Sequence, residues 1–324
     1  MRRAAILCLA ALSVLAAGAA ASFVLRGTTA KWRFVEYRIE DPSASPTVIA
    51  AGSDGSVWFT NNQSDKIGRV RNGTLQLLPT SGRIAEPLGL GVGSDGSAWF
   101  TDPGARAICR ITQAGLVSRF PVGTPIALFG RLAAAPDGSV WFAEPTSYSI
   151  TRFKDGNFNR YGIESPRGGP FGVAVAPDGV VWASLQSANQ LLRIDRKGKI
   201  ETFDIPRDGA VPTDVALGPD GAVWFIEFWV NSIGRWRDGK FAEFGIDRPA
   251  SAPSGLAVGT DGTVWFAMLR YSSLGRLRDG VIQSISLPRK DARPFSVTID
   301  ASGNVWYADI DGYVGMLPAR FARG

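Results

Sequence analysis

The sequence contains no histidine, and this absence excludes much of the usual chemistry of enzymes. Imidazole is the commonest general base near neutral pH and the commonest metal ligand, and Ser-His and Cys-His nucleophile pairs both require it. The sequence also has no G-x-S-x-G elbow, Walker loop or C-x-x-C pair. Any catalysis by this chain would therefore have to use carboxylates, lysine, arginine, tyrosine or a bound metal.

Cysteine is almost as scarce. Cys8 lies in an apolar N-terminal stretch, and Cys109 occupies a position where other repeats of the chain carry glycine. Two such cysteines cannot form a useful disulfide, so the fold has to be held together by packing alone. We expect Cys109 to be a small buried thiol.

The surplus of positive charge is small. The net charge is +6, and Arg2 and Arg3 lie in a targeting segment, which leaves 6 − 2 = +4 for the rest of the chain. No run of lysine and arginine is long enough to form a nucleic-acid patch, so we expect these charges to be solvated surface charges and no nucleic acid to be a partner.

Residues 1–25 have the composition of an export segment. A short basic start precedes an uncharged, mostly apolar run over residues 4–25, and the small residues at 19–21 suit a signal-peptidase site. The run is also about long enough to span a bilayer, so an uncleaved membrane anchor is the alternative. Either alternative predicts an exported protein, periplasmic or extracellular, with residues 26–31 as a linker.

One short phrase, D/S-G-x-V/A-W-F/A/Y, occurs seven times and organises the remainder of the chain. Its tryptophans follow one another at intervals of 41 or 42 residues: Trp58, Trp99, Trp141, Trp182, Trp224, Trp265 and Trp306. A fixed period of this length with strand-rich content is typical of propeller blades. The hydrophobic content of 45% is ample for a packed core.

Each repeat divides into four strands. An apolar strand, usually introduced by proline, leads into an Asp-Gly hairpin turn and then into the tryptophan strand. A third strand carries I/L-G-R or a relative, and a second hairpin turn leads to the fourth strand. The third-strand arginines recur in six repeats, which favours a structural role: Arg69, Arg110, Arg152, Arg193, Arg235 and Arg276.

The chain ends predict how the ring closes. After Trp306 only one strand, residues 314–317, precedes a charged tail at 318–324, while residues 32–39 resemble the fourth strands of the other repeats. The N-terminal strand should therefore complete the last blade and leave no long unpaired edge. We predict one all-β domain over residues 32–317, a seven-bladed β-propeller of four antiparallel strands per blade, which we expect to be a monomer.

The face opposite the hairpin turns is where binding residues are expected, because strand starts and blade-to-blade links meet there. At the ends of the tryptophan strands and the starts of the first strands, acids and one arginine recur: Asp102, Arg131, Glu144, Asp214, Glu227 and Asp309. Oxygen ligands of this kind suit Mg²⁺ or Ca²⁺, with Glu227 and Asp309 as the predicted ligands. Hydrated rim acids that bind no metal are the alternative.

The links between blades add a second, cationic set on the same face: Arg83, Arg167, Arg207, Arg248, Arg289, Lys290 and Arg293. These residues would attract an anionic ligand, or they are ordinary loop arginines. Trp229, beside Phe228, is a candidate stacking platform unless its neighbours bury it.

The repeat phrase resembles the blade signature of the streptogramin B lyases (virginiamycin B lyases), most clearly over residues 218–227 and 231–235. The resemblance extends over nearly all of residues 32–317. It implies a seven-bladed propeller, and it implies elimination at the ester bond of a cyclic depsipeptide by histidines and an acid-held Mg²⁺. The slots that match those histidines hold Thr213, Ser254 and Phe295 here, which do not accept a proton near neutral pH.

Three functions remain open at this stage, and the sequence assigns no catalytic residue. The first is binding of a small molecule, peptide or envelope component by Asp102, Arg131, Glu144, Asp214, Glu227, Trp229 and Asp309, without lyase activity. The second is a metal-dependent lyase or hydrolase in which Glu227, Asp309 or Asp214 replaces histidine. The third is a scaffold that offers the whole face to another protein.

Overall fold

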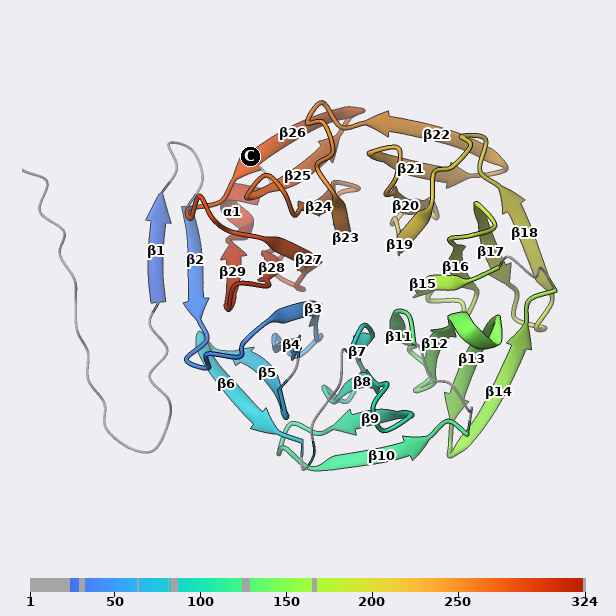
Figure 1. Ribbon diagram of the computed structural model, residues 1–324, viewed down its shortest axis with the longest axis horizontal. Helices are drawn as coiled ribbons and strands as arrows, with labels where there is room; N and C mark the ends of the chain where they lie inside the picture. The colour runs from blue at the N-terminus through green and yellow to red at the C-terminus, as the bar shows by residue number, and fades with distance from the viewer. Residues whose placement is uncertain are drawn as a thin grey trace, which may run out of the picture.

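The computed structural model describes residues 24–28, 33–62, 64–80, 82, 87–123, 129–164 and 168–322. Apart from the single-turn helices η1 (Pro145–Ser147) and α1 (Ala319–Ala322), all regular structure in these ranges is β. Seven sheets stand around a common axis (Figure 1). This arrangement confirms the predicted seven-bladed all-β propeller. Within the described ranges, no helix has the length and apolar character needed to cross a membrane.

The blades are numbered in chain order, and each strand is given from the innermost to the outermost. Blades 1 to 3 consist of β3 (Pro46–Ala51), β4 (Val57–Asn61), β5 (Lys66–Arg71) and β6 (Thr74–Pro79); β7 (Leu90–Val92), β8 (Ala98–Asp102), β9 (Ala107–Ile111) and β10 (Val117–Pro121); and β11 (Leu132–Ala134), β12 (Val140–Glu144), β13 (Ser149–Lys154) and β14 (Asn157–Gly162).

Blades 4 to 6 consist of β15 (Pro170–Val175), β16 (Val181–Leu185), β17 (Gln190–Ile194) and β18 (Ile200–Asp204); β19 (Pro212–Leu217), β20 (Val223–Glu227), β21 (Ser232–Arg237) and β22 (Lys240–Gly245); and β23 (Pro253–Val258), β24 (Val264–Met268), β25 (Ser273–Arg278) and β26 (Val281–Ser286). The innermost strand of every blade faces the centre of the ring in Figure 1.

Blade 7 joins the two ends of the chain. Its strands are β27 (Pro294–Ile299), β28 (Val305–Asp309), β29 (Tyr313–Leu317), β2 (Arg33–Arg38) and β1 (Val24–Thr28). The pairing of β2 with β29, with Glu36 opposite Gly315 and Tyr37 opposite Val314, confirms the predicted closure. In the structure β1 adds a fifth strand on the outer edge of β2 (Figure 1).

The predicted export segment, residues 1–25, lies outside the described residues except for Val24 and Leu25 in β1. Three residues of the predicted linker, 26–28, also belong to β1. At the other end, α1 begins the predicted tail, and its Ala322 is buried against blades 6 and 7.

A glycine of the third strand explains how each blade packs within itself. A Cβ added at Gly234 would overlap the ring of Phe225, which lies flat over the glycine from the neighbouring strand. Blades 1, 6 and 7 repeat this contact with the pairs Gly68 and Phe59, Gly275 and Phe266, and Gly315 and Tyr307. In blade 2 the equivalent residue is Cys109, which is buried as predicted, and burial raises the pKa of its thiol to about 12.

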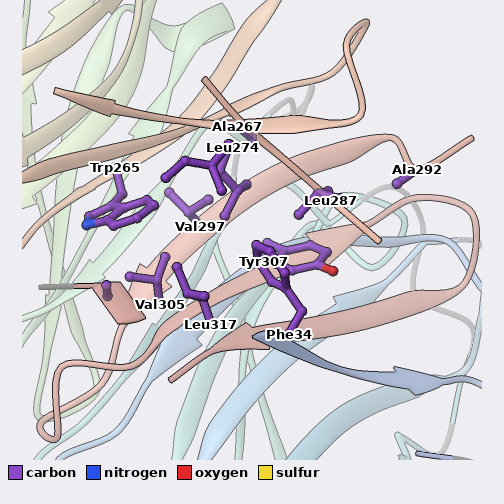
Figure 2. Close-up of a cluster of buried hydrophobic side chains, with 12 residues drawn as sticks. Phe34, Trp265, Ala267, Leu274, Leu287, Ala292, Val297, Val305, Tyr307 and Leu317 are labelled. Carbon is purple, nitrogen blue, oxygen red and sulfur yellow. The ribbon is translucent and has the colours of Figure 1, made fainter. Parts of the chain in front are cut away.

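The tryptophans fill the spaces between blades. In the cluster between blades 6 and 7, Trp265 packs with Val297 and Val305, while Tyr307 meets Phe34 edge to face at 6.1 Å between ring centroids (Figure 2). Because Phe34 comes from β2, the N-terminal strand contributes to this core as well as to the sheet. Burial of such aromatic side chains is a main source of stability in the ring.

The third-strand arginines cover the tryptophans, which supports the structural role predicted for them. Their guanidinium groups lie 5.0–5.9 Å from the indole centroids in five blades: Arg69 over Trp58, Arg110 over Trp99, Arg152 over Trp141, Arg235 over Trp224 and Arg276 over Trp265. In a cation–π contact of this length the guanidinium group covers the face of the indole ring.

Candidate functional site

The links between second and third strands and the links between blades lie on the same face of the ring, which we call the link face. Backbone hydrogen bonds tie the two kinds of link together, for example from Trp229 N to Ala210 O and from Arg270 N to Ser251 O. The last residue of the strand 2–3 link is left-handed in six blades: Arg106, Tyr148, Asn189, Asn231, Ser272 and Gly312. The face is therefore built from tightly held turns rather than from long loops.

The innermost strands approach one another closely on this face. A Cβ on Gly172 would overlap the carbonyl oxygen of Thr213 in the next blade, so only glycine permits this approach. The first strands of blades 1 and 4–7 also shift register near their starts, as bulged strands do. The innermost strands thus pack against one another around the centre of the ring.

Two of the predicted site residues meet across this centre. The Nε of Arg131 in blade 3 lies 3.4 Å from Oδ1 of Asp214 in blade 5. The other carboxylate oxygen of Asp214 accepts a hydrogen bond from Leu256 N, at 3.1 Å, in blade 6. The pair therefore links three blades, and the buried Nε of Arg131 is left without a hydrogen-bond partner among the described residues.

The four strand-end acids do not converge on the central channel. They are almost completely buried, and each contacts the fourth strand of its own blade or a neighbouring link. Alternation along the strand explains this orientation, because Glu227 lies two residues after Phe225 and so shares its face of the sheet. The same spacing relates the remaining acids to buried rings: Asp102 to Phe100, Glu144 to Phe142 and Asp309 to Tyr307.

In blades 2 and 3 these acids are paired with arginines of the fourth strand. The Nη2 of Arg119 lies 3.8 Å from Oδ2 of Asp102, and the Nε of Arg160 lies 3.1 Å from Oε1 of Glu144. Thr151 also donates its hydroxyl to Glu144. Both acids thus have a local countercharge and serve the packing of their own blades.

In blade 7, Asp309 belongs to a buried cluster of four charged or phenolic groups. Arg289 donates to Asp309, and its Nε lies 3.5 Å from Oε1 of Glu36. The hydroxyl of Tyr307 donates to the same Glu36 oxygen at 2.6 Å. Burial raises the pKa of both Glu36 and Asp309, and the Arg289 guanidinium opposes that rise.

In blade 5, Glu227 lies beside a second carboxyl group, Glu243. Burial first, and then the Glu243 carboxylate, raise the pKa of Glu227 from 4.5 to about 8. Only 2% of Glu227 is exposed, and its Oε2 has no hydrogen-bond partner. Arg207 reaches the pair only through Glu243, at 3.5 Å from Nη1 to Oε1.

These surroundings do not fit the predicted Mg²⁺ or Ca²⁺ site. Glu227 and Asp309 lie in different blades, and no three Asp, Glu or Cys residues in the described ranges form a metal-binding group. Asp309 is already engaged by Arg289 and by the backbone N–H groups of Arg293 and Asp311. A hard cation needs six to eight oxygen ligands, roughly, and would have to displace a buried arginine here.

Trp229 is the most exposed large hydrophobic residue of the link face. It is 75% exposed, and Phe228 beside it is partly exposed, with the two ring centroids 6.5 Å apart. Backbone hydrogen bonds from both residues to the preceding link, at Val211 and Ala210, hold the aromatic pair in place. The structure thus excludes the buried alternative for Trp229.

The predicted ring of cationic links is heterogeneous. Arg248 lies over the ring of Tyr271 at 5.5 Å, and Arg293 pairs with Asp311. Arg289 is the buried partner of Asp309, whereas Arg207 is largely exposed. Arg83 and Arg167 lie outside the described residues.

Fourth-strand partners such as Glu36, Arg119 and Glu243 were missed by sequence reasoning. The signal that identifies them is their position opposite the third-strand glycine slot, at Gly315, Cys109 and Gly234.

Two grooves lie on the opposite, hairpin face rather than at the predicted site. One, of ≈ 500 Å³, runs between blades 5 and 6 beside Trp224 and Arg278, and the other, of ≈ 510 Å³, runs between blades 6 and 7 beside Trp265 and Asp300. Among the described residues, arginines line only the first of these grooves.

A curated protein that this sequence matches is a lyase. A virginiamycin B lyase of Nocardia farcinica (strain IFM 10152) is 30% identical over 175 residues, which is 54% of this chain and 45% of the relative. The chain thus matches less than half the length of this curated relative.

Solved structures with a similar architecture include lyases of the same group. A streptogramin B lyase superimposes with a TM-score of 0.83 and 27% identity, covering 89% of this chain and 99% of that one. A catalytically inactive histidine-to-alanine variant of virginiamycin B lyase from Staphylococcus aureus, with quinupristin, superimposes with a TM-score of 0.83 and 26% identity. The match again covers 89% of this chain and 99% of that one. YCF48 bound to D1 peptide, at 14% identity and a TM-score of 0.70 over 90% of this chain and 96% of that one, shares the fold alone.

The sequence profile of the virginiamycin B lyase family matches residues 20–155 and 129–319. Since these matches span the whole propeller and the blade phrase recurs throughout it, this chain belongs to the virginiamycin B lyase family.

Proposed function

We propose that this protein is an exported propeller that binds a small molecule, a peptide or an envelope component on its link face, without the elimination reaction of its relatives. The observation that carries this proposal is the complete absence of histidine. Elimination at an ester requires a base that removes a proton from the carbon adjacent to the one that carries the ester oxygen, so that a carbon–carbon double bond forms as the carboxylate leaves. The residues in the matching slots, Thr213, Ser254 and Phe295, have no group that accepts a proton near neutral pH.

The carboxylates do not replace the missing base. Asp102, Glu144 and Asp309 are buried and paired with arginines, and Asp214 is held by Arg131 and a backbone N–H group. A base must reach the proton that it removes, and these groups are already engaged by partners within the protein. Glu227 is the one strand-end acid without a countercharge in contact, and it is used below for binding.

The S. aureus relative supports the separation of binding from turnover. Its histidine-to-alanine variant is described as catalytically inactive and as a structure with quinupristin. A family member that lacks a histidine is thus still found together with a streptogramin. We infer that a ring without histidine retains the capacity to bind.

Trp229 is the residue that we propose to contact the ligand first. Three quarters of its surface is free on the link face, and hydrogen bonds hold its backbone, so stacking has to order only the side chain itself. Phe228 and the more distant Tyr148 add aromatic surface on the same face. A ligand with an aromatic or other flat apolar group suits this surface.

Export rests on the N-terminal sequence. The basic start and the apolar run over residues 4–25 are typical of a secretory signal or membrane anchor, and the family profile begins only at residue 20. We therefore propose a periplasmic or extracellular location, with membrane anchoring if the segment stays uncleaved.

Calorimetric titration with quinupristin tests the binding proposal. We expect saturable binding that Trp229→Ala weakens about tenfold or more, since stacking on an aromatic side chain contributes on the order of 1 kcal/mol or more. Val281→Ala, an exposed residue on the outer strand β26, is the matched control and should leave affinity unchanged. Equal loss in both variants, or no binding by any of them, would contradict the proposal and favour a protein scaffold.

A further inference from the structure

The seven blades share a pair of positions that faces one side of each sheet. The first is the last residue of the second strand, and the second is the fourth-strand residue opposite the repeat glycine slot. In blade order the pairs are Asn61 and Leu77, Asp102 and Arg119, Glu144 and Arg160, Leu185 and Thr202, Glu227 and Glu243, Met268 and Ser284, and Asp309 and Glu36. We call each of them a rim pair.

Two rim pairs, those of blades 5 and 7, contain two carboxyl groups. In blade 7 the guanidinium of Arg289 lies between the acids, in contact with Glu36 and Asp309, and only 15% of the arginine side chain is exposed. The hydroxyl of Tyr307 adds a hydrogen bond to Glu36. Blade 7 therefore shows how this fold satisfies an acid–acid rim pair: a planar cation enters from the preceding link.

Blade 5 lacks both of these partners. Arg207 follows Pro206 as Arg289 follows Pro288, yet 57% of its side chain is exposed, and of the two acids its guanidinium group pairs with Glu243. The residue equivalent to Tyr307 is Phe225, which has no hydroxyl group to donate. Oε2 of the buried Glu227 is left without a hydrogen-bond partner. A buried carboxyl group without a partner is costly, so a site of this kind favours a bound cation.

We propose that the rim pair of blade 5, Glu227 and Glu243, binds the guanidinium group of a ligand, in the place that Arg289 fills in blade 7. The ligand class is an arginine side chain of a peptide or a small alkylguanidine. A planar guanidinium bridges two carboxyl groups with paired hydrogen bonds, which an ammonium group does less well.

The surroundings of the pair provide access and a second contact. About a third of the Glu243 side chain is exposed, at 32%, so a side chain can enter past it as Arg289 enters in blade 7. Trp229, two residues after Glu227, presents its ring on the same link face, where it can stack on the ligand. This inference rests on the proposed function and gives it a ligand class.

Titration with arginine amide, citrulline amide and lysine amide tests the inference. Citrulline keeps the shape of arginine without its charge, and lysine keeps the charge without the planar group. We expect arginine amide to bind at least about tenfold more tightly than either, and Glu227→Gln and Glu243→Gln each to remove about a factor of ten. Glu144→Gln is the matched control, because Glu144 has the same position in blade 3 and is paired with Arg160. This variant should leave the affinity for arginine amide unchanged.

Arg207 provides a second readout, because it is the side chain that competes for the site. Arg207→Ala should tighten binding of arginine amide severalfold, whereas loss of binding in this variant would overturn the assignment. Equal affinity for arginine and citrulline amides, or for arginine and lysine amides, would overturn it as well. If arginine amide does not bind while quinupristin binds through Trp229, this inference fails and the proposed function stands.

Discussion

At the scale of single residues, the acid at the end of the second strand has different properties in different blades, because the fourth-strand residue beside it differs. Asp102 and Glu144 have arginines on the fourth strand, whereas Glu227 has a second carboxyl group there. Burial and Glu243 together raise the pKa of Glu227 to about 8, so the folded protein holds its proton more tightly than the unfolded chain does. The contribution of the Glu227 carboxyl group to the free energy of unfolding therefore depends on pH.

The sign of that dependence yields a prediction. Since the folded pKa lies above the ordinary value of 4.5, the stability of the wild type falls as pH rises from 4.5 through about 8. Glu227→Gln removes the titrating group and should stabilise the protein by on the order of 2 kcal/mol at roughly pH 9, with little change at roughly pH 5. Thermal unfolding at both pH values measures the difference. An equal effect at both would show that the carboxyl group does not titrate as described.

At the scale of strands, the packing of the third-strand glycine on the second-strand ring sets the spacing within a blade. Gly68 and Phe59 form such a contact, and there is no room for a methyl group between them. Gly68→Ala should therefore destabilise the protein by about 1–3 kcal/mol through overpacking. Gly162→Ala, at the open end of β14, has nothing within 4 Å of the added carbon and should be nearly neutral. Equal unfolding midpoints in denaturant for the two variants would contradict this account.

The links between blades provide a second prediction at this scale. Arg289 and Arg207 occupy equivalent positions, but only Arg289 lies between two buried acids. Arg289→Ala should destabilise the protein by about 3 kcal/mol because it leaves the carboxyl groups of Glu36 and Asp309 uncompensated. Arg207→Ala should change stability by less than about 0.5 kcal/mol, as exposed ion pairs do. Chemical denaturation measures the unfolding free energy of both variants. Similar losses of stability in the two would contradict the claim that only Arg289 compensates two buried acids.

At the scale of the whole molecule, closure of the ring depends on β2, which joins residues from the two ends of the chain. Phe34 fills the core between blades 6 and 7 (Figure 2). Glu36 completes the Arg289 cluster. Removing residues 1–39 should leave β29 as an unpaired edge and abolish cooperative unfolding. Removing residues 1–23 should preserve it. A cooperative thermal transition in the shorter chain would contradict closure by β2.

Most of the fold could be predicted because the same blade phrase occurs seven times in the sequence. The tryptophan interval, the Asp-Gly turns and the similarity of residues 32–39 to other fourth strands determine the blade count and the closing strand. The fifth strand, β1, was not predicted, because its residues fall partly in the predicted export segment and partly in the predicted linker. Repetition thus identifies what the blades share and says little about the ends.

The site could be predicted only in part. The sequence identified the residues at strand ends, and Arg131 and Asp214 do meet across the centre. It did not indicate that the strand-end acids lie buried against the fourth strand or a neighbouring link. Their spacing of two residues from buried rings such as Phe225 does predict that they share the sheet face of those rings. Partners from other strands, such as Glu243 and Glu36, depend on register, which a single strand does not reveal.

The most direct test of the account is a ring-opening assay with quinupristin, followed by liquid chromatography and mass spectrometry. Elimination would give a linear product of unchanged mass, whereas hydrolysis would add the mass of one water molecule. A virginiamycin B lyase with its histidines serves as the positive control. We predict that this protein binds quinupristin and leaves the ring intact, with or without added Mg²⁺. A linear product of either mass, formed by the purified protein and lost in Glu227→Gln, would contradict the account.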